Sequence, residues 1–139
     1  RGTATMGVSY LLDTHILLWW LFNDPKLNAE CRDIIRNPAH RILVSSVSAW
    51  EIATKYRIGK LPEAKQIVEE YSQILHQSKF IELPITSAHA LRAGSLPISH
   101  RDPFDRMIMA QAELENLPVI TYDAAFQTGL IRVIPALKQ

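Results

Sequence analysis

Strand-like and helix-like segments alternate from one end of this chain to the other, and this alternation limits the fold more than any single motif. The strand-like segments are short, almost wholly apolar runs that end in polar or turn residues. They are "VSYLLDT" (8–14), "RILVSS" (41–46), "KFIELP" (79–84), "LPVITYD" (117–123) and "IRVIPA" (131–136). Strands that are apolar throughout are typical of a parallel sheet covered by helices on both faces. The pattern therefore predicts an α/β fold, a three-layer α/β/α sandwich with a mainly parallel sheet.

Helical spacing fills the segments between these runs. Asn28 is a candidate N-cap, Ser48 and Glu51 have the spacing of a capping box, and Gly59 is a candidate helix end. The segment 62–78 is expected to be the longest helix. The expected helices are 15–22, 26–37, 46–60, 62–78, 87–94 and 102–116, with a helical turn at 124–129.

Length and composition indicate one folded domain. The chain has 139 residues, of which 47% are apolar and 21% charged, as in ordinary globular proteins. The opening "RGTAT" does not look native, so we expect a native start at Met6 and a single domain over residues 6–139. A net charge of +1 argues neither for nor against nucleic-acid binding, because the local clustering of charge matters more than its sum.

Cysteine content and apolar runs bear on the compartment. Cys31 is the only cysteine, so no intramolecular disulfide can form, and a reducing cytoplasm is expected. The longest apolar run, 16–22, is far shorter than the ~20 residues that span a bilayer, so no membrane association is expected.

Two acidic residues follow predicted strands directly. Asp13 closes "YLLD" and Asp123 closes "VITYD". In parallel sheets, ligands bind beyond the carboxyl ends of the strands. For each residue alone, a helix N-cap or a turn is an open alternative. Glu51, in the helix after the second strand, belongs to the same edge; a capping box with Ser48 or an ion pair with Lys55 would also explain it.

The stretch "HRDPFDRMIMAQAE" (100–113) places two further acids one turn apart. Asp102 before Pro103 is the expected N-cap with proline at the first helical position. Asp105 instead heads the apolar stripe of the same helix: Ile108, Met109 and Ala112. A carboxylate that faces the protein interior is costly unless a positive group meets it, and Arg106 lies on another face. A bound cation is the simplest explanation.

Acids from four separate segments would then converge at one edge of the sheet: Asp13, Glu51, Asp105 and Asp123. Their mutual repulsion would be relieved by a divalent metal. Since the ligands are hard oxygens and no histidine or cysteine has zinc-like spacing, Mg²⁺ or Mn²⁺ is favoured. His100 is interpreted as a loop or surface residue, not a ligand.

Four motifs in this chain together resemble a PIN domain of the VapC toxin type. They are "LLDTHILLWWL", "SSVSAWEIATKYRIGKL", "HRDPFDRMIMAQA" and "VITYDAAF", and with the segments between them they cover nearly all of the chain after Met6. The resemblance implies a PIN fold, a centre for Mg²⁺ or Mn²⁺, and endoribonuclease activity that leaves 5′-phosphate and 3′-hydroxyl ends. It also implies a VapB-type antitoxin and a homodimer, to which the aromatic-rich first helix could contribute.

Carried over onto this sequence, the four family acids fall on Asp13, Glu51, Asp105 and Asp123. Orientation onto the apolar stripe favours Asp105 over Asp102 as the third. Thr14, Thr121 and Asp102 are expected to orient the metal ligands or a water molecule without binding the ion themselves. Contacts with RNA phosphates are expected from nearby basic residues: Lys55, Arg57, Lys60, Arg101 and Arg106. A solvated basic face or an antitoxin-binding face is the alternative for each of these.

Two other functions remain open at this stage. A phospho-receiver signalling domain is also α/β with acids and Mg²⁺ at strand ends, but it needs an acceptor aspartate after the third strand and a lysine after the last. The ends "FIELP" and "RVIPA" provide neither. A PIN scaffold acting only in RNA binding or assembly is the other alternative, and intact acids argue against it. The sequence does not identify the RNA.

Overall fold

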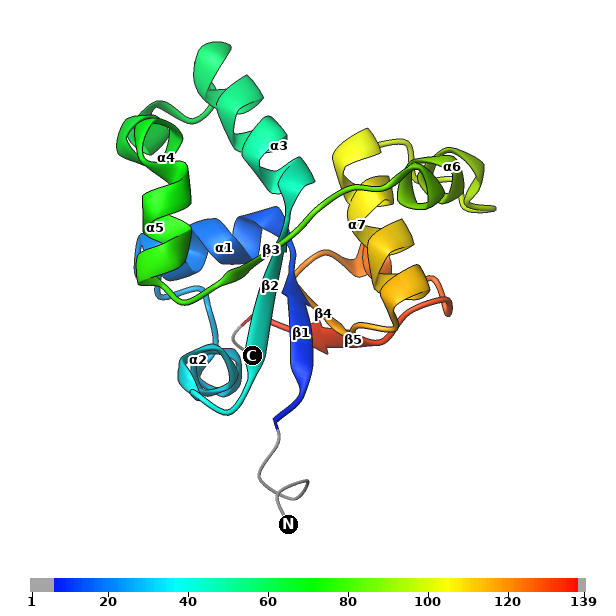
Figure 1. The fold of residues 1–139 in the computed structure, drawn as a ribbon, viewed down its shortest axis with the longest axis horizontal. Helices are drawn as coiled ribbons and strands as arrows, with labels where there is room; N and C mark the ends of the chain where they lie inside the picture. The colour runs from blue at the N-terminus through cyan, green and yellow to red at the C-terminus, as the bar shows by residue number, and fades with distance from the viewer. Residues whose placement is uncertain (1–6, 138–139) are drawn as a thin grey trace.

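A computed structural model describes residues 7–137 of the chain, so the expected start at Met6 lies outside the described residues. All five predicted strands are present and form one parallel sheet in the order β3-β2-β1-β4-β5 (Figure 1). The strands are β1 (Ser9–Leu12), β2 (Arg41–Ser45), β3 (Ile81–Leu83), β4 (Val119–Thr121) and β5 (Val133–Pro135).

Helices cover both faces of the sheet, as the sequence predicts. One side carries α1, α2, α4 and α5, the other carries α6 and α7, and α3 stands over the edge at which the strands end (Figure 1). The α-helices are α1 (Thr14–Leu21), α2 (Ala29–Arg36), α3 (Ser46–Arg57), α4 (Lys65–Glu69), α5 (Tyr71–Gln77), α6 (Ser87–Ser95) and α7 (Pro103–Glu115). Two short 3₁₀ helices are η2 (Pro62–Ala64) and η3 (Ala124–Phe126).

Successive residues of each inner strand pack into different cores, because side chains alternate across a strand. Leu12 of β1 joins the core under α1 and α2, whereas Leu11 joins the core under α6 and α7. In β2, Val44 packs into the core under α1 and α2, and Leu43 packs into the core under α6 and α7. Burial on both faces explains why these runs are apolar throughout.

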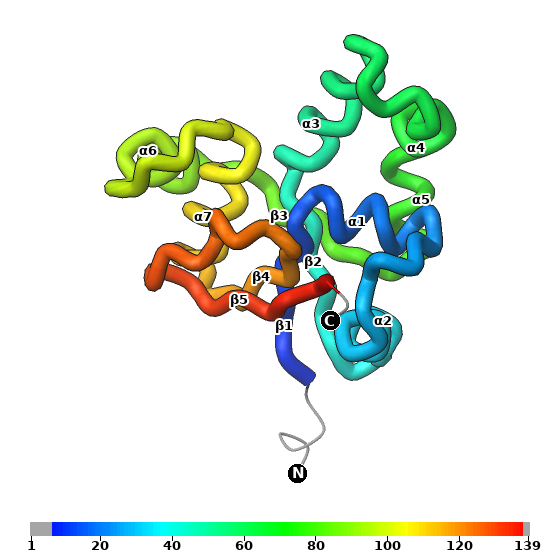
Figure 2. The backbone as a smooth tube through the Cα atoms, turned by 180° about the vertical axis from the view of Figure 1, so that it is seen from behind, coloured from blue at the N-terminus to red at the C-terminus, as the bar shows by residue number. Residues whose placement is uncertain are grey.

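The strand order places the edge at which such sheets bind ligands beside β1. From β1 the chain moves outward through β2 to β3, then returns to the other side of β1 to form β4 and β5 (Figures 1 and 2). The carboxyl ends of β1 and β4 therefore form a topological switch point, where α/β sheets bind ligands. A phospho-receiver has the order 2-1-3-4-5. The observed order is different, so the receiver alternative is wrong.

The segment 62–78 is not one helix. It forms η2, α4 and α5 in succession, with the break between the α-helices at Glu70, where φ is −124° and ψ is 30°. The break lets α4 pack against α3 while α5 packs near β3. The apolar stripe itself is retained, since Ile67 and Leu75 are both buried in the same core.

The capping box of Ser48 and Glu51, which the sequence left open as an alternative, is not formed. Helix α3 begins at Ser46, as expected, because the hydroxyl of Ser45 accepts a hydrogen bond from the Val47 N–H at 3.0 Å and acts as the N-cap. Ser48 lies inside the helix, buried, with its hydroxyl 2.8 Å from that of Thr14. Glu51 is therefore deeper in the helix than a capping residue would be.

Other predicted helix ends are confirmed. The side chain of Asn28 caps α2 by accepting from the Cys31 N–H, and Gly59 follows α3 with a φ of 81°, a conformation that favours glycine. Across residues 7–137, no helix has both the length and the apolarity needed to cross a membrane.

Candidate metal centre at the carboxyl edge

Asp13 lies at the switch point and is almost fully buried, with 1% of its surface exposed. It occupies the N-cap position of α1, yet its side chain makes no capping hydrogen bond. Its Oδ2 accepts a hydrogen bond of 2.8 Å from the Thr121 hydroxyl, whereas its Oδ1 is buried without a partner. Burial raises the pKa of Asp13 to about 6; repulsion from Glu51 and Asp123 adds to this rise, and hydrogen bonds from Thr121 and the backbone oppose it.

The two threonines expected to orient the acids behave differently. Thr121, at the end of β4, donates to Asp13 and also accepts a 3.0 Å hydrogen bond from the Asp123 N–H, so it joins two of the predicted acids. Thr14 lies next to Asp13 in the chain, but its hydroxyl pairs with Ser48. That hydroxyl therefore joins α1 to α3. Thr121, which donates to Asp13, is the better candidate for orienting a metal ligand.

Glu51 projects from α3 and is 1% exposed. Its Oε2 lies 2.5 Å from the ammonium of Lys55 one turn on, while its Oε1 is buried without a partner. Burial lowers the pKa of Lys55, but the hydrogen bond and the charge of Glu51 outweigh it and the net shift is upward. The ion pair considered from sequence is thus present, and Glu51 still has a free oxygen at the sheet edge.

Helix α7 separates the roles of its two aspartates as the sequence predicts. Asp102 is the N-cap: its Oδ1 accepts from the Phe104 N–H at 2.9 Å and from the Asp105 N–H at 3.3 Å. Asp105 is buried on the inner side of the helix with Ile108. Burial raises the pKa of Asp105 to about 6, a hydrogen bond to His100 opposes the shift, and repulsion from Asp13, Asp102 and Glu51 adds to it.

His100 contributes more than the sequence suggested. It lies in the loop before α7, but its Nε2 is 2.8 Å from Asp105 Oδ2. His100, Asp105 and Asp123 each offer a ligand atom, and these atoms lie within 4.8 Å of one another. His100 is five residues from Asp105 in an irregular segment, where no sequence periodicity reveals the contact.

Asp105 and Asp123 lie close enough to Asp13 and Glu51 for the charges of these acids to affect one another. Asp13 and Glu51 both raise the pKa of Asp105, and Asp123 raises that of Asp13. The four predicted acids therefore interact electrostatically, although only Asp105 and Asp123 belong to the group whose ligand atoms lie within 4.8 Å of one another. Asp13 Oδ1 and Glu51 Oε1 are buried without a protein partner, which is costly in a low-dielectric interior. A divalent cation would satisfy these oxygens and reduce the repulsion, so the residues fit the predicted ion.

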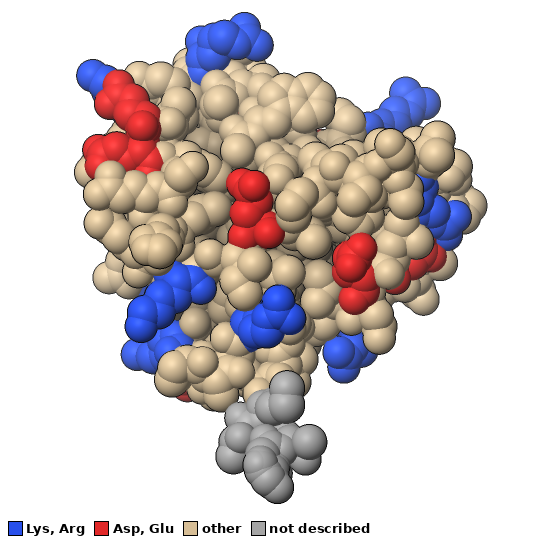
Figure 3. Space-filling model, in the orientation of Figure 1, with Lys and Arg blue, Asp and Glu red and all other residues tan. Residues whose placement is uncertain are grey.

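The basic residues near this centre are not equivalent. Arg106 was expected to contact RNA, but its guanidinium donates to backbone carbonyls of the last turn of α6 and of the α6–α7 connection, at 2.8 Å to Ala93 and 2.8 Å to His100. This bonding gives Arg106 a structural role and occupies donors that an RNA phosphate would need. Arg57, Lys60 and Arg101 are exposed and remain candidates. On the face in Figure 3, basic and acidic groups are interspersed, without one continuous basic surface.

Comparison with known proteins agrees with this architecture. A segment of this chain is 54% identical over 70 residues to "Ribonuclease VapC16" of Mycobacterium tuberculosis; the match covers 49% of this chain and 50% of that protein. "Ribonuclease VapC22" of the same organism is 27% identical over 114 residues, covering 81% of this chain and 85% of that protein. The chain thus spans about half the length of the first relative.

Solved structures share the fold at low sequence identity. VapBC2 from Rickettsia felis, solved with a DNA fragment from its promoter, has a TM-score of 0.68 at 17% identity, covering 93% of this chain and 99% of that chain. DNA-bound VapBC from Salmonella typhimurium has a TM-score of 0.65 at 19% identity, covering 93% and 98%. The PIN domain model matches residues 10–128, most of the described chain and all four predicted acids. The chain therefore belongs to the PIN domain family.

Proposed function

We propose that this chain is a metal-dependent endoribonuclease and the toxin of a toxin–antitoxin pair. The observation that carries the proposal is the pair of buried carboxylate oxygens without partners, Asp13 Oδ1 and Glu51 Oε1, at the switch point of the sheet. A protein with no use for a cation would lose stability from such groups and gain nothing in return. Two relatives are named ribonucleases and the structural neighbours are VapBC complexes, which supports the same reading.

The metal ligands would be Asp13, Glu51, Asp105 and Asp123, with Mg²⁺ or Mn²⁺ as the ion. When bound, such an ion lowers the pKa of a water and neutralises charge on the scissile phosphate. The two aspartates with a pKa near 6 are mostly ionised at neutral pH, so they would be ready to bind metal there.

Several residues of the chain would hold this centre in place. Thr121 orients Asp13 through its hydroxyl, and the N-cap of Asp102 fixes the first turn of α7, from which Asp105 projects. His100 holds Asp105 from the loop side and could move a proton near the reacting phosphate. Hydrolysis would add water to phosphorus and release the 3′ oxygen, leaving 5′-phosphate and 3′-hydroxyl ends.

A cleavage assay tests the proposed activity. The purified chain should cut RNA with Mg²⁺ or Mn²⁺ and stop cutting with EDTA, because the acids provide no nucleophile of their own. Asp13→Asn, prepared in parallel, controls for a contaminating nuclease. Equal cleavage in EDTA by protein that passes this control would refute the metal-dependent mechanism. RNA binding without any cleavage would instead support the non-catalytic PIN scaffold.

The expected partners are a VapB-type antitoxin, RNA and a second copy of the chain, all within the cytoplasm. Co-expression with the small reading frame next to the gene should suppress both toxicity and RNase activity. An adjacent frame without effect on either would count against the antitoxin.

Light scattering at micromolar concentration should give the mass of a homodimer, and a monomer there would count against self-association.

A further inference from the structure

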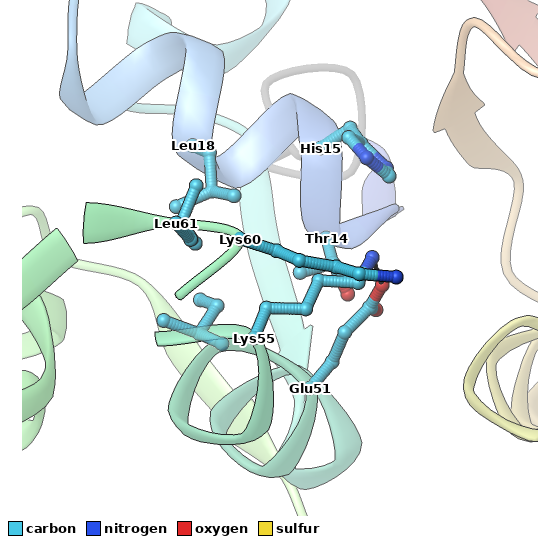
Figure 4. Close-up of a pocket in the computed structure, with 8 residues that line it drawn as sticks. Thr14, His15, Leu18, Glu51, Lys55, Lys60 and Leu61 are labelled. Atoms are coloured by element: carbon cyan, nitrogen blue, oxygen red, sulfur yellow. Dashed lines mark hydrogen bonds and ion pairs between the residues drawn. The ribbon is translucent and has the colours of Figure 1, made fainter. Parts of the chain in front are cut away.

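A pocket opens directly beside the acidic centre, between α1 and α3 and the segment after α3. Its volume is about 340 Å³. The residues around it are Thr14, His15, Leu18, Glu51, Ile52, Lys55, Lys60 and Leu61, most of which Figure 4 labels. Because Glu51 belongs both to this pocket and to the predicted metal ligands, anything bound here would lie next to the reacting bond.

The wall of this pocket has an apolar side and a charged side. Leu18, Ile52 and Leu61 form the apolar side, and Figure 4 shows Lys55 and Lys60 extending toward the carboxylate of Glu51. An apolar wall with a few convergent polar groups is typical of sites for small ligands or single residues of a polymer.

The two lysines differ in their freedom to bind. Lys55 is held by Glu51 at 2.5 Å, so its charge is already matched. Lys60 is exposed, and no ion pair joins it to another residue between 7 and 137. Lys60 is therefore the positive group of this pocket that is available to a phosphate.

We propose that this pocket holds one nucleotide of single-stranded RNA next to the scissile bond, with the base against Leu18, Ile52 and Leu61 and a phosphate on Lys60. The inference rests on the proposed ribonuclease function and adds a subsite to it. An apolar wall and a free cation match the two chemically distinct parts of a nucleotide.

The size of the pocket favours an unpaired nucleotide. A volume of about 340 Å³ is near the lower end of ligand sites, large enough for a base but not for a helical segment. Bases of duplex RNA are stacked and paired, and their deep major groove is closed to side chains. Only an unpaired base, in a single strand or a loop, can enter from the side.

Binding is measured on an Asp13→Asn background in Mg²⁺, so that RNA stays intact and the readout does not depend on cleavage. The probe is a fluorescent oligoribonucleotide, either unpaired or annealed to its complement, followed by anisotropy. Two variants alter the pocket: Leu61→Trp fills its apolar side, and Lys60→Gln removes its free charge. Arg41→Gln, an exposed charge at the opposite edge of the sheet, is the matched control.

The single strand should bind more tightly than the duplex. Leu61→Trp should weaken single-strand binding about tenfold while leaving duplex binding unchanged. Lys60→Gln should make the negative slope of log K against log salt shallower by about 0.7, the value for one phosphate contact of a single strand. Arg41→Gln should leave this slope unchanged. Circular dichroism checks folding, and Lys60→Gln keeps the test decisive if Leu61→Trp fails to fold, because Lys60 is exposed.

Two results would overturn the subsite. One is unchanged single-strand affinity and salt slope in the pocket variants. The other is normal RNA binding with loss of antitoxin binding, which would assign the pocket to a protein segment. Either result is compatible with full RNase activity of the unaltered chain, whereas failure of the proposed function would appear as absence of that activity.

Discussion

Asp13 and Asp102 occupy the same position, the N-cap of a helix, but only one of them caps it. Asp102 accepts hydrogen bonds from two backbone N–H groups of α7. Asp13 makes no capping bond to α1; it accepts from Thr121 and keeps Oδ1 unpartnered and buried. Asp102 is half-buried, whereas Asp13 is 1% exposed.

The difference shows that tertiary surroundings, not position along a helix, decide what such an aspartate does. A capping aspartate contributes roughly 1 kcal/mol to stability by satisfying a helix terminus. Asp13 forgoes this contribution and carries the cost of a buried charge, which raises its pKa to about 6. An aspartate that makes no capping bond and whose buried charge has no compensating partner is typical of a functional site.

Asp13→Asn should have the largest effect of the changes considered. Removing the charge removes a predicted metal ligand. Cleavage should therefore fall by more than the roughly 100-fold expected when a residue that only hydrogen-bonds to a ligand is lost. The metal-free protein should be as stable as the unaltered one or more stable, because a buried charge is relieved. Initial rates and urea unfolding in EDTA measure the two effects. A small loss of rate, with metal affinity unchanged, would remove Asp13 from the centre.

Asp105→Asn and Asp102→Asn test the same contrast within one helix. Asp105→Asn should reduce cleavage by orders of magnitude, since Asp105 is buried and interacts electrostatically with Asp13 and Glu51. Asp102→Asn should leave most of the activity, because asparagine caps a helix about as well as aspartate. Steady-state rates for both variants, with calorimetric Mn²⁺ affinities, provide the comparison. Loss of cleavage in Asp102→Asn alone would show that the two assignments are reversed.

Much of this site was predictable because its residues follow regular periods. The apolar strands indicated the sheet, and strand ends indicated Asp13 and Asp123. Helical periodicity showed that Asp105 faces inward and that Arg106 does not. Periodicity gave the direction of Arg106 but not its partners, because those are backbone carbonyls at the end of α6 and in the α6–α7 connection.

The remaining features depend on contacts between distant segments. The break at Glu70 has no proline or glycine to mark it; it follows from α4 and α5 packing on different neighbours. The Ser48 pattern matched a capping box, but Ser45 at the end of β2 competes for the same helix start. His100 meets Asp105 through an irregular loop, which has no period from which the contact can be predicted.

Thr121→Val should have the next largest effect. Valine keeps the shape of threonine but cannot donate to Asp13 or accept from the Asp123 N–H. Loss of a residue that hydrogen-bonds to a metal ligand typically costs about 10–100-fold in metal affinity or activity. Calorimetric titration with Mn²⁺ measures it, and Thr121→Ser, which keeps the hydroxyl, should recover most of the affinity. Equal affinity for all three proteins would show that Thr121 has only a packing role.

The stability of metal-free protein should depend on pH in the direction set by Asp13 and Asp105. Both have a folded-state pKa of about 6, above the ordinary value of 3.8, so the folded state binds more protons between these values. The free energy of unfolding should therefore rise as the pH falls from 7 to 5, by on the order of 1 kcal/mol per group. Urea unfolding in EDTA measures it, with Asp13→Asn expected to show a smaller rise. Saturating Mn²⁺ should suppress the rise, because bound metal keeps the acids ionised.

Asp102→Ala should produce the smallest effect, and one that falls on stability instead of cleavage. Alanine cannot accept from the Phe104 and Asp105 N–H groups, so the first turn of α7 loses its cap at a cost of about 1 kcal/mol. Most of the cleavage rate should remain under conditions where the variant is folded, because Asp105 still projects from the same helix. Thermal unfolding measures the loss, and Asp102→Asn should restore stability because its side-chain oxygen accepts the same bonds. If Asp102→Ala instead lost cleavage in proportion to Asp13→Asn while keeping its stability, the two N-cap aspartates would share one function and the contrast between them would be wrong.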